Sequence, residues 1–120
     1  MDETRFRAIY PVIHNILDST IRPDVDSYNL LEVLHRILLR AHPERAKALV
    51  AEFEQLWKDD SFSDEELTKI FNQDVPPECA LMHESTVRAV LFSLAVYLRY
   101  IYRHEKLDQG PAIFPSRDGP

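Results

Sequence analysis

The chain has 120 residues, of which 45% are hydrophobic and 28% are charged, a composition typical of one globular domain with its own core. Its single cysteine, Cys79, excludes an internal disulfide, and its net charge of −6 argues against a dedicated nucleic-acid binder, which normally carries a basic stripe. The acidic start at residues 1–4 is unlike a signal peptide, and the most apolar stretch, residues 89–98, would span only about 15 Å as a helix, so we expect a cytoplasmic protein without a membrane span.

Helical spacing of apolar residues begins near the N-terminus and is interrupted by a proline. Intervals of three and four residues predict a helix that buries one stripe, made of Phe6, Ile9, Tyr10, Ile13, Ile16 and Leu17. Pro11 lies inside this stripe, so the helix is either kinked there or restarts with Pro11 in its first turn.

Two further helices are predicted on either side of Pro43. The first covers about residues 27–40, after a turn at Pro23, and its inward stripe consists of Leu30, Leu31, Leu34, Ile37, Leu38 and Ala41. It ends at His42, because the residue before a proline is pushed out of the α region, and Pro43 can then open the next helix. That helix repeats the spacing with Ala46, Leu49, Val50, Phe53, Leu56 and Trp57.

A short fourth helix has a well-specified start. Ser63 and Glu66 have the spacing of a capping box, and Phe62 and Leu67 have that of a hydrophobic staple. These signals predict a helix over residues 64–72, which the proline-containing segment 75–77 ends.

The last predicted helix, about residues 84–105, is apolar on two sides. One stripe consists of Val87, Val90, Leu91, Leu94, Leu98 and Ile101, and the other of Ala89, Phe92, Val96 and Tyr100. A helix that is apolar nearly all round is buried on several sides, so we expect it to be the central helix or to lend Phe92, Val96 and Tyr100 to a homodimer.

With no convincing strand, the sequence predicts an all-α, single-domain bundle of about five helices. The bundle should cover residues 1–107 and contain a central, apolar C-terminal helix. Residues 108–120 hold three prolines and both glycines and are predicted to form a flexible or loosely docked tail, in which Ile113 and Phe114 could contact the body.

Candidate metal ligands lack the partners that such sites need. Glu32 and His35 form an E-x-x-H pair, but a di-iron bundle requires a second pair, which the sequence does not contain. Cys79 and His83 lie four residues apart, yet neither His104 nor Glu84 completes a zinc spacing. Calcium-loop registers that start at Asp59 or Asp60 place Ile70 or Phe62 where an oxygen ligand is needed. We therefore expect no metal, no cofactor and no catalytic residue.

The negative charge is concentrated in one acidic window, residues 59–78. It contains one cation, Lys69, while the rest of the chain carries equal numbers of acidic and basic side chains. The seven carboxylates of the window are Asp59, Asp60, Asp64, Glu65, Glu66, Asp74 and Glu78. The dipole of a helix favours carboxylates in its first turn, which explains those at residues 64–66 but not the other four. Two interpretations remain open: a solvated surface, or a docking face on which these carboxylates and Phe62 contact a basic protein partner.

These patterns favour a non-enzymatic, acidic module that binds another protein. Its most concrete form is an inhibitor, since in size, charge and helical make-up the chain is similar to some bacterial immunity proteins that neutralise a basic nuclease toxin, although no motif carries the resemblance. The carboxylates would then mimic the phosphates that the toxin expects, and the protein itself would not contact nucleic acid. The alternatives are a dimeric helical scaffold or regulator that uses the last helix as its interface and, least favoured, a small helical enzyme.

Overall fold

The computed structural model describes residues 2–21, 30–73 and 80–105, and within them it contains helices and no strand. In chain order the elements are α1 (Asp2–Ile9), α2 (Pro11–Ile16), the π-helical segment η1 (Leu17–Ile21), α3 (Leu30–Arg40), α4 (Pro43–Leu56), α5 (Asp64–Asn72) and α6 (Val87–His104). The all-α prediction is confirmed. The described residues form six α-helices where about five were predicted, because the first stripe is divided at its proline.

The chain leaves the helical conformation at Tyr10 and restarts at Pro11. Tyr10 has φ −124° and ψ 62°, and Pro11 is the first residue of α2, where its missing N–H costs nothing. No side chain of α2 or its cap satisfies the next amides. Instead the Glu52 carboxylate, from α4, accepts from the N–H groups of Val12 at 3.2 Å and Ile13 at 2.9 Å. Burial raises the pKa of Glu52, while these two hydrogen bonds act in the opposite direction.

The predicted starts of α4 and α5 are confirmed. Pro43 opens α4, and the His42 ring accepts a hydrogen bond from the Glu44 N–H. At α5, Ser63 Oγ accepts from the Glu66 N–H at 3.0 Å and the Glu66 carboxylate accepts from the Ser63 N–H at 2.7 Å, which completes the capping box. Phe62 and Leu67 are both fully buried beside it.

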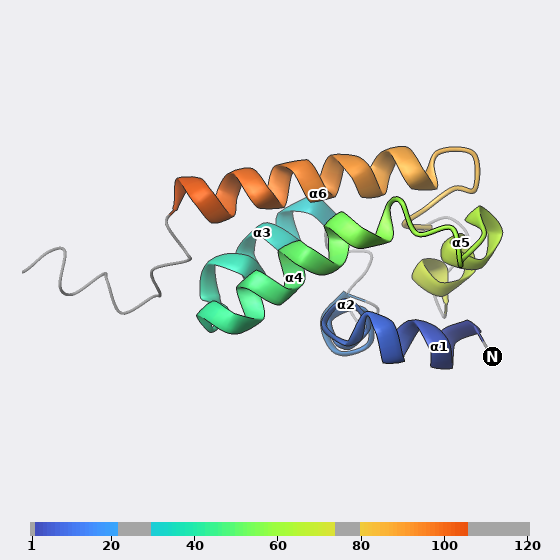
Figure 1. The fold of residues 1–120 in the computed structure, drawn as a ribbon, viewed down its shortest axis with the longest axis horizontal. Helices are drawn as coiled ribbons and strands as arrows, with labels where there is room; N and C mark the ends of the chain where they lie inside the picture. The colour runs from blue at the N-terminus through green and yellow to red at the C-terminus, as the bar shows by residue number, and fades with distance from the viewer. Residues whose placement is uncertain (1, 22–29, 74–79, 106–120) are drawn as a thin grey trace, which may run out of the picture.

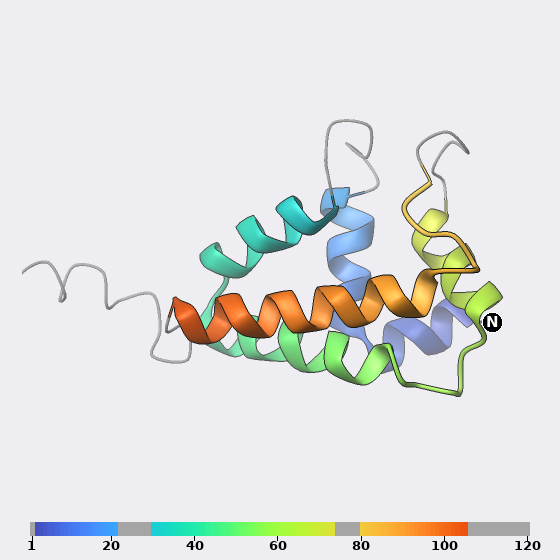
Figure 2. The ribbon, with the colours of Figure 1, turned by 90° about the horizontal axis from the view of Figure 1, so that it is seen from above.

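The helices form two groups on either side of α4. Figure 1 shows α6 lying along α4, with α3 at its side, while α1 and α2 lie across the opposite side of α4. α5 packs between the start of α6 and α1. Seen from above in Figure 2, α6 lies in front of the other described helices, so one of its sides faces away from them. Contacts with α3, α4 and α5 make it the central helix that the sequence predicts.

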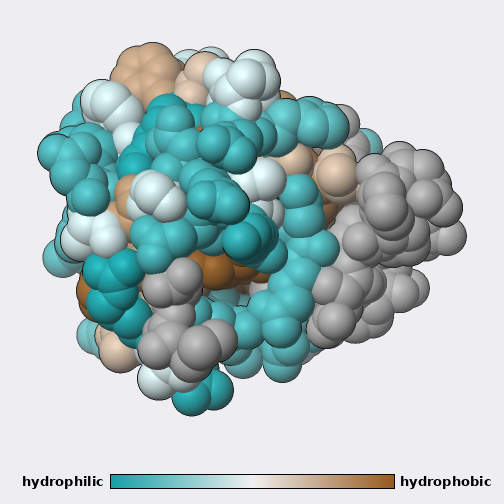
Figure 3. Space-filling view, turned by 90° about the vertical axis from the view of Figure 1, so that its right-hand side faces the viewer, coloured by the Kyte–Doolittle hydropathy of each residue, from teal (hydrophilic) through white to brown (hydrophobic). Residues whose placement is uncertain are grey.

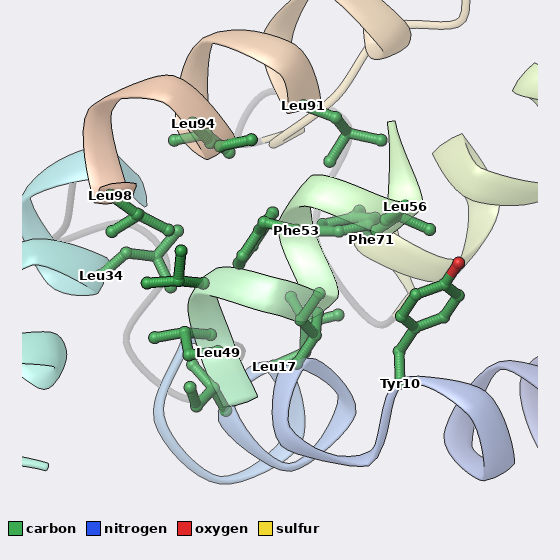
Figure 4. Close-up of a cluster of buried hydrophobic side chains, with 14 of the residues drawn as sticks. Tyr10, Leu17, Leu34, Leu49, Phe53, Leu56, Phe71, Leu91, Leu94 and Leu98 are labelled. Carbon is green, nitrogen blue, oxygen red and sulfur yellow. The ribbon is translucent and has the colours of Figure 1, made fainter. Parts of the chain in front are cut away.

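One hydrophobic core joins the two groups (Figure 4). Phe53 and Leu56 of α4 lie between Leu91 and Leu98 of α6 and Tyr10. Two details differ from the predicted stripes. Ile9, the last residue of α1, is 40% exposed, and Val33, which the predicted stripe of α3 does not include, is buried. The predicted start of α3 at residue 27, the turn at Pro23 and the tail at residues 108–120 lie outside the described residues.

α6 buries only one of its two apolar stripes. Val87, Leu91, Leu94, Leu98 and Ile101 are buried, as predicted, whereas Ala89, Phe92, Val96 and Tyr100 are exposed. The expectation that neighbouring helices would cover this second stripe is wrong for the described part of the chain, where only Trp57 at the end of α4 packs on it, against Phe92. None of the described helices is both long enough and apolar enough to cross a membrane.

Candidate functional site

Asp59, the first carboxylate of the acidic window, belongs to the connection between α4 and α5. Its side chain accepts hydrogen bonds from the Tyr10 hydroxyl, from the Ser61 N–H at 2.9 Å and from Ser61 Oγ at 2.6 Å. Partial burial tends to raise the pKa of Asp59, but the hydrogen bonds from Ser61 and Tyr10 outweigh it and lower that pKa. Asp59 therefore acts as a structural acceptor that ties the N-terminal segment to the α4–α5 connection.

Asp64 and Glu66 also have partners within the fold. Asp64 accepts from Arg88 Nε at 2.8 Å, and Glu66, in addition to its capping role, lies 3.8 Å from the Arg5 guanidinium. Phe62 has no exposed surface, and the Arg5 guanidinium lies 4.0 Å above its ring centroid. The staple position predicted for Phe62 is therefore confirmed, and its ring does not lie on the surface, where the docking interpretation placed it.

Three described carboxylates of the window are exposed, and of these Asp64 pairs with Arg88 while the other two make no contact across the fold. Asp60 is exposed, and Glu65 is exposed with only an i,i+4 ion pair to Lys69 at 3.3 Å. Asp74 and Glu78 lie outside the described residues. Figure 3 shows the end of the molecule that carries α5, where hydrophilic side chains cover most of the surface. The window thus combines carboxylates that hold the fold together with a smaller number that face solvent.

Arg88 holds the α4–α5 connection against the start of α6. Its Nη1 lies 3.0–3.3 Å from the carbonyl oxygens of Leu56, Trp57 and Asp59, and its Nη2 donates to the Phe62 carbonyl. The carbonyls at the end of α4 have no partner within their own helix, and they carry the negative end of its dipole, so a guanidinium suits this position. Arg88 explains why the residues around Asp59 keep one conformation.

The second stripe of α6 forms an apolar surface next to α4. Phe92 is 46% exposed, Val96 53% and Tyr100 59%, and they follow one another at intervals of four residues. The Trp57 ring, from the end of α4, packs edge-on against Phe92 with 4.8 Å between ring centroids. Tyr100 stacks on His104 with 5.4 Å between centroids and an angle of 9° between the planes. We call the surface formed by Phe92, Val96, Tyr100 and Trp57 the α6 face.

Two adjoining depressions follow the α6 face. One of about 270 Å³ lies between α4 and α6 and is lined by Trp57, Lys58 and Phe92 among others, while the next, of about 390 Å³, surrounds Tyr100 and Arg103. Val96 and Arg99 line both, so the two depressions adjoin and we call them together the groove, although every residue that lines the second one belongs to α6. Arg99 donates from Nε to Glu54 across it. The sequence identified Phe92, Val96 and Tyr100 but missed Lys58, since only the packing of α4 on α6 brings it to the groove.

The residues considered as metal ligands either bind other side chains or have no further metal-ligating side chains near them among the described residues. His35 Nδ1 lies 3.0 Å from the Tyr97 hydroxyl, and Glu32 pairs with Arg36 at 3.4 Å. His83 is exposed, and Cys79 lies outside the described residues. Within the described ranges, no three His, Cys, Asp or Glu side chains are grouped so that they could share a metal ion.

Within the part of the chain that the structure describes, the α6 face and the exposed carboxylates of the acidic window are therefore two surface features available to another molecule. The contacts of Arg88 and Glu52 were missed by sequence reasoning, because neither residue carries a local signal for partners so distant along the chain. Comparison of the chain with protein-family models, with curated proteins and with solved structures yields no match.

Proposed function

We propose that this protein is a non-enzymatic module that works by binding another protein, and that its α6 face is the contact surface. The observation that carries the proposal is the exposure of Phe92, Val96 and Tyr100 along two turns of one helix. The other large hydrophobic residues exposed in the described part, Ile9 and Leu39, lie on other helices. A contiguous apolar surface bordered by polar groups is typical of an interaction site, whereas single exposed apolar residues are common everywhere.

The energetics of the fold support the same proposal. Exposure of apolar surface costs roughly 25 cal/mol for each Å² left in water, and within the described fold these side chains gain only the contacts of Phe92 with Trp57 and of Tyr100 with His104. At Val96, a charged or small residue would stabilise the isolated domain about as well and would reduce aggregation. The stripe is therefore best explained by a partner that covers it.

Site-specific photo-crosslinking tests the proposal. A photoreactive residue at Val96 should form adducts with one protein in the cells that make this chain, while the same residue at Ala8, exposed on α1, should not. The Phe92→Asp variant should lose the adduct while keeping its helical far-UV spectrum. Equal adducts from both positions, or none from Val96, would contradict the proposal.

The acidic window supports a second form of this function, an inhibitor that docks on a basic partner such as a nuclease toxin. The observation in its favour is that Asp60 and Glu65 are exposed at the hydrophilic end of the molecule (Figure 3). Carboxylates gathered at one end steer a basic protein toward that end and raise its association rate.

A further inference from the structure

We infer that the groove between α4 and α6 binds an acidic, amphipathic helix of a partner protein. This inference rests on the proposed function and gives the chemistry of the partner at the α6 face. Two features of the groove lead to it: the spacing of its apolar residues and the sign of the charge along its edge.

The apolar residues are spaced to receive a helix. Phe92, Val96 and Tyr100 lie at intervals of four residues, so they extend over about 12 Å of helix axis. An amphipathic helix presents its own anchors at intervals of three and four residues and therefore covers a similar length with two or three side chains. The depressions of about 270 and 390 Å³ on either side of Val96 provide room for such anchors.

The charges along the groove are opposite in sign to the net charge of the chain. Lys58 lies at one end and Arg103 at the other, and neither forms an ion pair within the described residues. Between them Arg99 is neutralised by Glu54. A protein with a net charge of −6 thus presents an apolar groove with unneutralised cations at both ends, and a partner with carboxylates beside its anchors would complement them.

The same charges argue against a second copy of the chain as the occupant. A twofold interface places the same surface on both subunits, so the cations of one groove would meet those of the other. Glu54 is the one carboxylate that lines the groove, and it is already paired with Arg99. Like charges of this kind disfavour an interface unless an acid is placed between them.

Trp57 allows a direct measurement, because it is the only tryptophan in the chain and it lines the groove beside Phe92. The probes are three synthetic helical peptides of equal length: one amphipathic with glutamates on its polar face, one identical except for lysines in place of the glutamates, and one with the acidic composition in scrambled order. We expect the acidic amphipathic peptide alone to shift the Trp57 emission to shorter wavelength with saturable binding.

Variants identify the residues responsible. Val96→Asp should weaken binding of the acidic peptide at least about tenfold. Lys58→Glu and Arg103→Glu should each weaken it roughly fivefold and reduce its dependence on salt. Lys69→Glu makes the same charge change on α5 and is the matched control, expected to leave the affinity unchanged.

Several outcomes would overturn the inference. Stronger binding of the lysine peptide would mean that the partner helix is basic and not acidic. The proposed binding function would still stand if Val96→Asp abolished the binding of that peptide. Sedimentation that shows a dimer dissociated by Val96→Asp would make a second copy the occupant. A red shift of Trp57 emission in the free Phe114→Ala variant would show that the tail of the chain occupies the groove. Failure of all three peptides, together with no adduct from Val96, would remove the proposed function as well.

Discussion

Arg88 adds to the backbone hydrogen bonds of the α4–α5 connection, such as the one from the Asp59 N–H to the Leu56 carbonyl. Arg88 contacts four backbone carbonyls between Leu56 and Phe62 as well as the Asp64 carboxylate. Hydrogen bonds from a charged donor contribute more than neutral ones, and the carbonyls would lose their partner if the guanidinium were removed.

We therefore expect Arg88→Ala to lower the free energy of unfolding by about 2–4 kcal/mol, measured by urea denaturation. Arg88→Lys should recover less than half of this loss, because an ammonium group lacks the planar fork with which the guanidinium binds several acceptors at once. Lys69→Ala, which removes an exposed ion pair, is the control and should cost less than about 0.5 kcal/mol. Equal effects of the alanine variants would mean that Arg88 contributes only a surface charge.

Asp59 gives the stability of the protein a defined dependence on pH. Its pKa is lowered in the folded state, so its ionised form stabilises the fold at all pH values above the pKa of an unfolded aspartate, about 3.9. This contribution is lost as the pH falls through the lower pKa of the folded state. We expect Asp59→Asn to cost about 1 kcal/mol at neutral pH, after allowance for solvent screening, and the difference from wild type to shrink below about pH 4.

The measurement is urea denaturation between pH 3 and pH 7, followed by the fluorescence of Trp57. The neighbouring variant Asp60→Asn is the control, because Asp60 is exposed. It should leave both the stability and its pH dependence unchanged. A difference between wild type and Asp59→Asn that stays constant down to pH 3 would show that the hydrogen bonds do not depend on the charge of Asp59.

Contacts within one turn could be predicted from the sequence, and contacts across the fold could not. Ser63 and Glu66 are three residues apart, so their capping box has a local signature. By contrast, Tyr10 and Asp59 are 49 residues apart, and Glu52 reaches Val12 across 40 residues. The local sequence around a carboxylate does not indicate which distant donor it binds. The sequence therefore could not distinguish Asp59, a structural acceptor, from Asp60.

At the scale of the helix, α6 shows what hydrophobic periodicity determines and what it leaves open. The two stripes were identified from spacing alone, and the buried one is confirmed. Which stripe is covered depends on how many helices pack around α6 and at which angles, and that is a property of the whole chain. The stripe that remains exposed, Phe92, Val96 and Tyr100, is therefore the informative one for function.

Paired substitutions on α6 distinguish its two sides. Leu98 is fully buried, so Leu98→Asp should cost more than about 4 kcal/mol and should prevent folding. Phe92 is 46% exposed, so Phe92→Asp should cost only about 1 kcal/mol, mainly from its lost contact with Trp57. Thermal and urea unfolding measure both values. A loss of several kcal/mol for Phe92→Asp would mean that this side of α6 is covered in the free protein.

At the scale of the whole molecule, charge is distributed unevenly between the two ends. Carboxylates from residues 59–66 lie toward the end that carries α5, while α3 ends and α4 begins at the opposite end, which also holds the last turn of α6 (Figures 1 and 2). Arg40, Lys47 and Arg103 belong to that second end. The sequence revealed the acidic window but not its separation from these cations, because that separation follows from the antiparallel course of α4 and α6.

The uneven charge leads to a prediction about association with a basic partner. Neutralisation of the exposed carboxylates by Asp60→Asn with Glu65→Gln should change the stability by less than about 0.5 kcal/mol, since surface charges contribute little. The association rate with a basic partner captured from the source cells should fall several-fold, and its salt dependence should become shallower, because screening acts over about 8 Å at physiological salt.

The control for this prediction neutralises the structural carboxylates. Asp59→Asn with Asp64→Asn removes the same formal charge, but it also breaks the contacts with Tyr10 and Arg88. It should therefore lower the thermal stability clearly, whereas the surface pair should not. If the captured partner is acidic, or if it binds the surface variant at an unchanged rate and with an unchanged salt dependence, the exposed part of the window is a solvated surface. Binding would then depend on the α6 face alone, where the cations Lys58 and Arg103 favour a partner of the opposite charge.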